Sequence, residues 1–240
     1  MTFLYQPAEG YCYNSDTLAL FHFIEENLKI FKNIQGELLD IGSGSGILGI
    51  LVAKKYPKLS LNCSELQEEF IFLTQKNTQI NTIDANLFEG DFREIEFEKS
   101  FDIVISNPPF YPASNFQSEN QSLKIARYND SLPLENLIEK SAKVLKENGK
   151  FFFCYDVKLL DDIIFFCKKY RLNIESLQFL HPKKDRKSSL VMVYVRKNSK
   201  SLLTILPPLI MFEGENFTKE MEAIYTMCNT YSIKVDMKQL

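Results

Sequence analysis

The residues best suited to chemistry form a tetrad directly after an apolar run: Asn107, Pro108, Pro109 and Phe110. Two consecutive prolines make a stiff loop, because each has a fixed φ of about −65° and no N–H to donate. The first proline also keeps Asn107 out of the helical region. Such a loop can aim the side-chain oxygen of Asn107 and the carbonyl oxygen of Pro108 at a planar –NH2 group, on which Phe110 could stack. An ordinary proline-rich loop after a strand would have the same sequence. The motifs upstream of the tetrad are therefore needed to distinguish the two interpretations.

A glycine-rich turn forms the second candidate site, with Gly42, Gly44 and Gly46 at alternate positions. Glycine lets the backbone approach a ligand, and the free N–H groups of a following helix point to the same place. Asp40, just before the turn, would repel a pyrophosphate and would suit the ammonium group of an amino-acid moiety. The turn also contains the dinucleotide spacing Gly44-x-Gly46-x-x-Gly49, so an anionic cofactor such as NAD and a purely structural turn remain possible.

Two more carboxylates follow apolar runs further along the chain. Glu65 ends the run that comes after the glycine turn, where a carboxylate can accept hydrogen bonds from both hydroxyls of a ribose. Asp91 follows Gly90 and could accept from the amino group of an adenine. Glu65 could equally be a solvated acid at a strand end, and Asp91 a simple turn aspartate.

The elements that must position these residues alternate between strand and helix. We expect strands at 37–41, 59–63, 86–88, 101–106, 150–155, 174–180, 189–195 and 202–206, and helices at 47–56, 66–80, 133–149, 159–170 and 218–231. Gly149 is expected to end the third helix, and the polar stretch 111–130 is expected to be a functional or disordered loop. Alternation of this kind predicts a parallel sheet with ligands beyond the carboxyl ends of its strands. All four polar candidates, Asp40, Glu65, Asp91 and Asn107, fall at such ends.

Composition narrows the class of protein. The length of 240 residues, 45% hydrophobic and 25% charged, is typical of one soluble globular domain. We expect no signal peptide and no membrane span, because residues 1–25 contain acids and no apolar run reaches the length of a span. Five scattered cysteines without a CxxC pair predict reduced thiols, a cytoplasmic location and no metal site. A net charge of −3 argues against a protein that coats nucleic acid non-specifically.

Together, the glycine turn, Glu65, Asp91 and the Asn107 tetrad resemble the class I S-adenosylmethionine methyltransferases. The tetrad is similar to that of enzymes that methylate an exocyclic or amide nitrogen. The runs 10–20, 190–193, 204–209 and 217–225 resemble the bacterial tRNA1(Val) adenine N6-methyltransferase family, which acts on the adenine next to the anticodon. The resemblance implies an α/β, Rossmann-like fold with a seven-stranded, mostly parallel sheet and helices on both faces. It implies a single domain, 1–240, with a cofactor-covering segment (1–35), a catalytic core (36–197) and a C-terminal extension (198–240).

The resemblance also implies the roles of individual residues. S-adenosylmethionine would bind at Asp16, Asp40, Gly42, Gly44, Gly46, Glu65, Leu66, Asp91, Phe92 and Asn107. Asp40 and the glycines would hold its methionine end under the Asp16 segment, Glu65 its ribose, and Asp91 with Phe92 its adenine. The catalytic residues would be Asn107, Pro108, Pro109 and Phe110, and no His or Cys base is required.

Two basic stretches are candidates for RNA contacts. Lys124 and Arg127 match a basic stretch of the family, although Asn129 stands where the family pattern has an acid. Lys183, Lys184 and Arg186 lie where a glycine-containing loop is expected, and a solvated loop is the competing interpretation. Both departures bear on the identity of the target more than on the chemistry.

The sequence therefore predicts a monomeric methyltransferase that modifies the N6 of an adenine in tRNA, next to the anticodon of a valine tRNA. A protein glutamine N5-methyltransferase would use the same tetrad, although it usually resembles a chain with a separate N-terminal helical domain, and about 35 residues precede the first predicted strand. A methyltransferase that acts on guanine N2 in ribosomal RNA and a binding module without catalysis would also carry these cofactor motifs.

Overall fold

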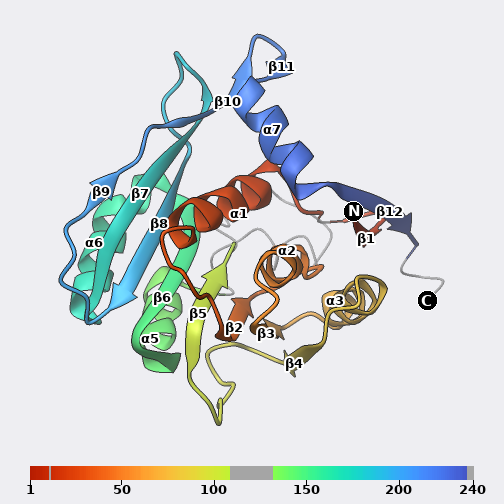
Figure 1. The fold of residues 1–240 in the computed structure, drawn as a ribbon, viewed down its shortest axis with the longest axis horizontal. Helices are drawn as coiled ribbons and strands as arrows, with labels where there is room; N and C mark the ends of the chain where they lie inside the picture. The colour runs from red at the N-terminus through yellow and green to blue at the C-terminus, as the bar shows by residue number, and fades with distance from the viewer. Residues whose placement is uncertain (11, 109–131, 237–240) are drawn as a thin grey trace.

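The structure is a computed structural model that describes residues 1–10, 12–108 and 132–236. Within these residues a ten-stranded sheet forms the core, in the order β11-β10-β7-β8-β6-β5-β2-β3-β4, with β9 paired to β7 (Figure 1). Its strands are β2 (Gly36–Ile41), β3 (Leu59–Glu65), β4 (Ala85–Glu89), β5 (Phe101–Ser106), β6 (Leu145–Asp156), β7 (Leu172–Lys183), β8 (Leu190–Lys197), β9 (Thr204–Ile205), β10 (Leu209–Glu213) and β11 (Asn216–Phe217). The seven strands from β7 to β4 are the predicted sheet. The C-terminal extension adds three more, so the predicted count of seven was too low.

The sheet is mostly parallel, as predicted. Strands β2, β3, β4, β5 and β6 pair in parallel, and β8 runs antiparallel between β6 and β7. The helices are α1 (Ser15–Leu28), α2 (Ile47–Lys55), α3 (Glu68–Ile80), α5 (Leu134–Val144), the short 3-10 helix η3 (Val157–Leu159), α6 (Leu160–Lys169) and α7 (Lys219–Cys228). Helices α1, α2 and α3 pack together on one side of the sheet, and α5 packs with α6 on the other.

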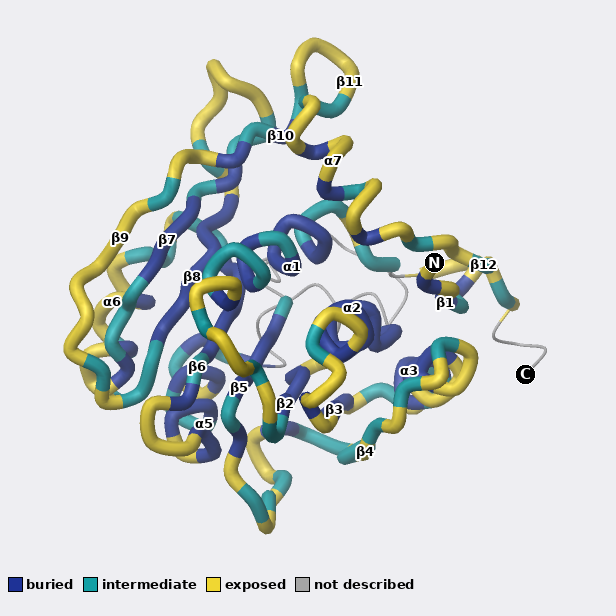
Figure 2. The backbone as a smooth tube through the Cα atoms, viewed as in Figure 1, coloured by how far each residue is buried: buried dark blue, intermediate teal, exposed yellow. Residues whose placement is uncertain are grey.

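Burial on all sides explains why part of β6 and helix α2 show no alternation of apolar and polar residues. Phe151, Phe152 and Phe153 of β6 are all fully buried, because helices cover both faces of the sheet. Helix α2 is buried from Ile47 to Ala53, since it lies between its neighbours and the sheet. Figure 2 shows this buried interior along β8, β2 and α2, with exposed backbone at the turn between β10 and β11.

Two predicted helix ends were wrong. Helix α5 ends at Val144, and Gly149 lies inside β6, where a Cβ atom would stand only 2.8 Å from the carbonyl oxygen of Lys146. Glycine is thus needed there for close backbone approach, and not to end a helix. Helix α7 ends at Cys228 because Asn229 is left-handed (φ 43°), and the chain continues as β12 (Thr230–Val235).

A small separate sheet joins the two ends of the described chain. β1 (Thr2–Pro7) pairs in parallel with β12, and the two strands lie side by side near α3 in Figure 1. Two asparagines one turn apart, Asn77 in α3 and Asn81 at its C-cap, hold β1. Asn77 accepts from the N–H of Tyr5 (2.6 Å) and donates to its carbonyl (3.0 Å), and Asn81 does the same with Phe3 (3.2 and 2.6 Å). These amides mimic a neighbouring strand, which anchors the N-terminal segment beside the glycine turn.

Candidate active site

The carboxyl edge of the sheet brings three of the four predicted polar residues together. Asp40 lies near the end of β2, Glu65 ends β3, and Asn107 directly follows β5. The pairings of Ile41 with Ser64 and with Ser106 place these three strand ends next to one another. The described residues that line a cavity of about 40 Å³ at this edge are Gln6, Tyr13, Thr17, Asp40, Gly42, Ser43, Gly44, Ser45, Ile47, Leu48, Phe70 and Asn107.

The glycine turn requires glycine at each predicted position. Gly42, Gly44 and Gly46 all have left-handed backbone angles, with φ of 62°, 57° and 80°. Gly49 has a different reason, because a Cβ atom there would lie 2.8 Å from Leu61 and 2.9 Å from the Asp40 carboxylate. The third glycine of the dinucleotide-like spacing therefore allows α2 to pack closely on the sheet.

Asp40 is a buried carboxyl with an altered affinity for protons. Its Oδ2 accepts from the N–H of Gly49 at 2.9 Å. Burial raises the pKa of Asp40 to about 7, the Gly49 hydrogen bond acts in the opposite direction, and the negative charge of Glu65 adds to the rise. A cation entering this cavity would favour the ionised form.

Glu65 ties the end of β3 to the glycine turn. Its Oε2 accepts from the N–H of Gly44 (2.8 Å), and its Oε1 accepts from Leu66 (2.9 Å) and Gln67 (3.0 Å). Burial raises the pKa of Glu65, while the three N–H donors oppose that rise. The side chain of Leu66, 43% exposed, stands next to this carboxylate and offers an apolar surface beside it.

Asp91 and Phe92 lie further along the same edge, after β4. Asp91 forms an ion pair with Arg93, whose Nε is 2.9 Å from both carboxylate oxygens, and this hydrogen bonding lowers the pKa of Asp91. The ring of Phe92 is buried against Phe97, with ring centroids 6.1 Å apart. Its side chain belongs to the core, which leaves its main chain as the part able to contact a ligand.

Asn107 has partners on both heteroatoms of its carboxamide. Its Nδ2 donates to the hydroxyl of Thr17 (2.9 Å), and its Oδ1 accepts from the thiol of Cys154 (3.3 Å). Pro108, which follows, is buried. The predicted site residues Pro109, Phe110, Lys124 and Arg127 lie outside the described residues.

Asp16 lies in the first turn of α1, one residue before Thr17. Asn14 caps this helix by accepting from the N–H of Asp16 (3.1 Å), and its amide also donates to the Asp16 carboxylate (2.8 Å). Burial raises the pKa of Asp16, and the Asn14 hydrogen bond opposes that rise. The predicted covering segment thus reaches the site through the amino end of a helix.

The basic cluster of Lys183, Lys184 and Arg186 begins at the last residue of β7 and continues into the turn to β8. The pairing of Leu190 with both Leu180 and Asp156 puts this turn at the same edge of the sheet as Asn107. Three strand spacings, about 14 Å across the sheet, separate β5 from β7, and the turn also extends several residues beyond the level of Asn107. None of the three basic side chains forms an ion pair within the described part of the chain.

Sequence reasoning missed several residues of the site. Gln6 donates to the hydroxyl of Ser45 at 2.6 Å, and Thr74 donates to the carbonyl of Gly44 at 2.7 Å. Thr17 and Cys154 hold Asn107. Proximity to Asp16 could have indicated Thr17, whereas nothing distinguishes Cys154 from the apolar residues of β6.

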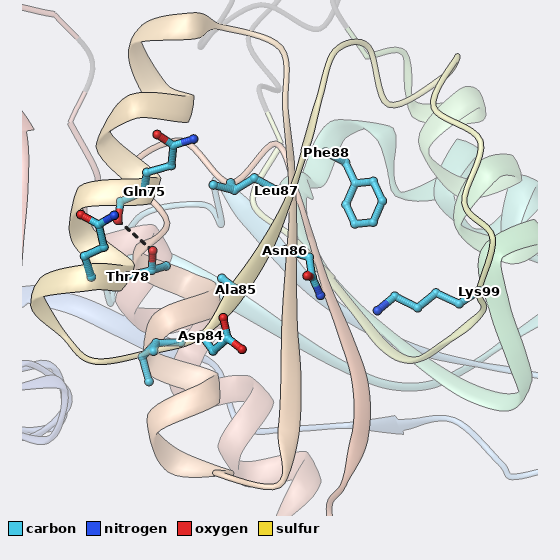
Figure 3. Close-up of a pocket in the computed structure, with 10 residues that line it drawn as sticks. Gln75, Thr78, Asp84, Ala85, Asn86, Leu87, Phe88 and Lys99 are labelled. Atoms are coloured by element: carbon cyan, nitrogen blue, oxygen red, sulfur yellow. Dashed lines mark hydrogen bonds between the residues drawn. The ribbon is translucent and has the colours of Figure 1, made fainter.

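A wider groove of about 860 Å³ runs along β4, the last strand of the sheet (Figure 3). None of the predicted site residues lines it. Two of its polar side chains are already bonded, since Asn86 donates to Asn62 (3.0 Å) and Lys99 to Glu37 (2.8 Å). We assign no ligand to this groove.

The described residues give two further observations. They contain no group of three His, Cys, Asp or Glu side chains arranged to hold a metal ion. None of their helices has both the length and the apolar content of a membrane span.

The chain resembles known methyltransferases in sequence. The family model for the methyltransferase small domain matches residues 19–160. A tRNA1(Val) (adenine(37)-N6)-methyltransferase of Pedobacter heparinus is 25% identical over 157 residues, which are 65% of this chain and 67% of that relative. One of the same name from Flavobacterium psychrophilum is 32% identical over 117 residues, 47% of this chain and 49% of the relative. A release factor glutamine methyltransferase of the same organism is 28% identical over 167 residues, 65% of this chain and 58% of the relative. The chain thus spans about half to two thirds of the length of these relatives.

The fold is also that of solved methyltransferases. A predicted O-methyltransferase from Agrobacterium tumefaciens has a TM-score of 0.65 at 18% identity, and the match covers 93% of this chain and all of the other. A methyltransferase from Pyrococcus furiosus has a TM-score of 0.55 at 20% identity, over 80% of this chain and 86% of the other. These likenesses confirm the predicted Rossmann-like fold. Since the family model covers more than half of the chain, the protein belongs to the methyltransferase small domain family.

Proposed function

We propose that this protein methylates the exocyclic N6 nitrogen of an adenine in tRNA, the adenine next to the anticodon of a valine tRNA. The observation that carries the proposal is the position of Asn107, which lines the same cavity as Asp40 and the glycine turn. An amide acceptor beside a methyl-donor site suits an acceptor –NH2 group. The names of the Pedobacter and Flavobacterium relatives support adenine N6 as that group.

The cavity residues fit the proposed binding of S-adenosylmethionine, which when bound supplies an activated methyl group on a sulfonium. The buried carboxyl of Asp40 is suited to the ammonium group of the methionine end. Glu65 accepts from three N–H groups and retains one lone pair, on Oε2, for a ribose hydroxyl.

The chemical task of the protein residues is to position a weak nucleophile. In our proposal, Oδ1 of Asn107 and the carbonyl of Pro108 accept hydrogen bonds from the target amine. These bonds orient its lone pair toward the methyl group and favour the positive charge that develops on the nitrogen. Phe110 would stack on the target base. An RNA base in a loop is already partly unstacked, so its presentation costs less than flipping a base from a duplex.

The basic cluster is the proposed contact with the RNA backbone, together with Lys124 and Arg127. Lys183, Lys184 and Arg186 are exposed, and their turn lies three strands from Asn107 at the same edge of the sheet. Phosphates several nucleotides from a base held at Asn107 are the proposed partners of these side chains. The contact would be local, because the whole chain has a net charge of −3.

A second candidate is a protein glutamine N5-methyltransferase. The release factor glutamine methyltransferase relative favours it, because it is 28% identical over 167 residues. A glutamine side chain also presents a planar –NH2, so the Asn107 site would serve both reactions.

The deciding experiment offers one protein three classes of substrate. Labelled S-adenosylmethionine is incubated with unmodified tRNA, ribosomal RNA and purified release factor, followed by nucleoside and peptide mass analysis. We expect N6-methyladenosine in tRNA at the position next to the anticodon. Label on the release factor, or on guanine in ribosomal RNA with tRNA blank, would overturn the proposed substrate.

A further inference from the structure

The Asn107 carboxamide is held by two residues that come from distant parts of the sequence. Thr17 of α1 lies 90 residues away and accepts from Nδ2 at 2.9 Å. Cys154 of β6 lies 47 residues away and donates its thiol to Oδ1 at 3.3 Å. One side chain therefore depends on two elements that are separate from its own strand.

Both partners are rigidly placed. Thr17 is 4% exposed, Cys154 is fully buried, and α1 packs against β6. The main chain before Asn107 is also fixed, because the hydroxyl of Ser106 donates to the carbonyl of Ile41 at 2.9 Å. The prolines restrict the following residues, so few degrees of freedom remain for the amide.

These two contacts fix the position of the carboxamide. The amide has a donor side and an acceptor side. In the structure the Thr17 hydroxyl accepts from Nδ2 and the Cys154 thiol donates to Oδ1, and because a hydroxyl can both accept and donate, these contacts set the place of the group more than its facing. Burial raises the pKa of Cys154 well above its usual range, with the charge of Asp16 as a second cause, so the thiol keeps the proton that it donates. A weak S–H donor occupies one lone pair of Oδ1 and leaves the other for a stronger donor.

We propose that Thr17 and Cys154 are positioning residues for methyl transfer, which hold the Asn107 carboxamide in place so that its oxygen can accept from the target amine. This inference rests on the proposed role of Asn107 as acceptor for the amine. It does not depend on whether that amine belongs to adenine, guanine or glutamine. It gives α1, an element of the cofactor-covering segment, a part in the transfer step.

The test uses matched pairs of variants in the full chain, assayed on whichever substrate the wild type methylates. Thr17→Val removes the hydroxyl at nearly constant volume and is expected to lower kcat about ten- to a hundredfold, since Nδ2 loses its partner. Thr17→Ser keeps the hydroxyl and should stay within about threefold of the wild type. Cys154→Ala should lower kcat about three- to tenfold, and Cys154→Ser, which keeps a donor, should restore it. The KM for substrate and the Kd for the cofactor should change less than about threefold in all four.

A double-mutant cycle separates positioning from a general packing effect. In an Asn107→Ala background, Thr17→Val should cause no further loss of single-turnover rate, because the group that it positions is gone. Wild-type kcat in Thr17→Val, or a loss that multiplies fully with that of Asn107→Ala, would overturn the inference. If Thr17→Val fails to fold by thermal melting, the Cys154→Ala and Cys154→Ser pair is decisive alone. A wild type inactive on all three substrate classes would instead refute the proposed function.

Discussion

The carboxyl edge of the sheet has a proposed cofactor half, with Asp40, the glycine turn and Glu65, and a proposed target half, which runs from Asn107 to the basic cluster. The two halves hold their polar side chains in different ways. On the cofactor half, Glu65 is bonded to main-chain N–H groups that lie one, two and 21 residues away in the sequence. On the target half, Asn107 is bonded to side chains that lie 47 and 90 residues away. Main-chain donors persist when a side chain changes, whereas side-chain partners can be lost by single substitutions. We infer that cofactor binding is encoded locally and that target geometry depends on the assembled tertiary structure.

Removing the carboxamide of Asn107 should give the largest effect. Asn107→Ala is expected to lower kcat a hundredfold or more, because a group aligned with the developing charge is lost. Its Kd for S-adenosylhomocysteine should stay within about threefold of the wild type, because the ligands on the cofactor half remain. Single-turnover kinetics and calorimetry measure the two quantities. Equal losses in rate and affinity would show that the two halves do not act separately.

The corresponding change on the cofactor half is Glu65→Gln. We expect cofactor affinity to fall about ten- to a hundredfold, because an amide cannot accept from three N–H groups and would turn a donor toward at least one of them. Since the same carboxylate ties down Gly44, the melting temperature should also fall. Saturating cofactor should restore much of kcat, in contrast to Asn107→Ala. If saturating cofactor fails to restore kcat, the two halves of the edge do not have separate roles in cofactor binding and methyl transfer.

This division also explains what could be predicted from the sequence. Asp40, Glu65 and the glycine turn were identifiable, because left-handed glycines and acids at strand ends form a local pattern. β1 and β12 were not predicted, since each pairs with a strand at the opposite end of the chain and β1 is further held by amides of α3. Gly149 was misinterpreted, because the residue type that often follows a helix is also the one that permits close backbone approach. Cys154 carries its contact to Asn107 within an apolar run, and only the assembled sheet reveals it.

The buried carboxyl of Asp40 predicts a pH dependence confined to the cofactor half. Its pKa is raised to about 7 in the folded protein, so it favours the protonated state, and its contribution to stability is lost as the pH rises through 7. Between pH 5 and 8 the free energy of unfolding of the cofactor-free wild type should fall by roughly 1–3 kcal/mol relative to that of Asp40→Asn, whose side chain does not titrate. Urea unfolding of both proteins across this range measures the difference. Parallel stability curves would contradict the assignment, and added S-adenosylhomocysteine, which carries an ammonium group, should reduce the difference.

The smallest expected effect belongs to the basic cluster at the far end of the target half. Neutralising Lys183, Lys184 and Arg186 to Ala should weaken RNA binding several-fold and make the dependence of log Kd on log salt less steep by about one to three. The value of kcat at saturating RNA should stay near that of the wild type, because these residues lie three strands away from Asn107. A matched control neutralises Lys29, Lys32 and Lys58, which removes the same charge from the amino side of β2 and β3. If the control weakens binding as much as the cluster does, the effect is one of net charge and this turn is not the RNA contact. If only the cluster variant loses affinity, recognition of the target extends from Asn107 across β6 and β8 to the β7–β8 turn.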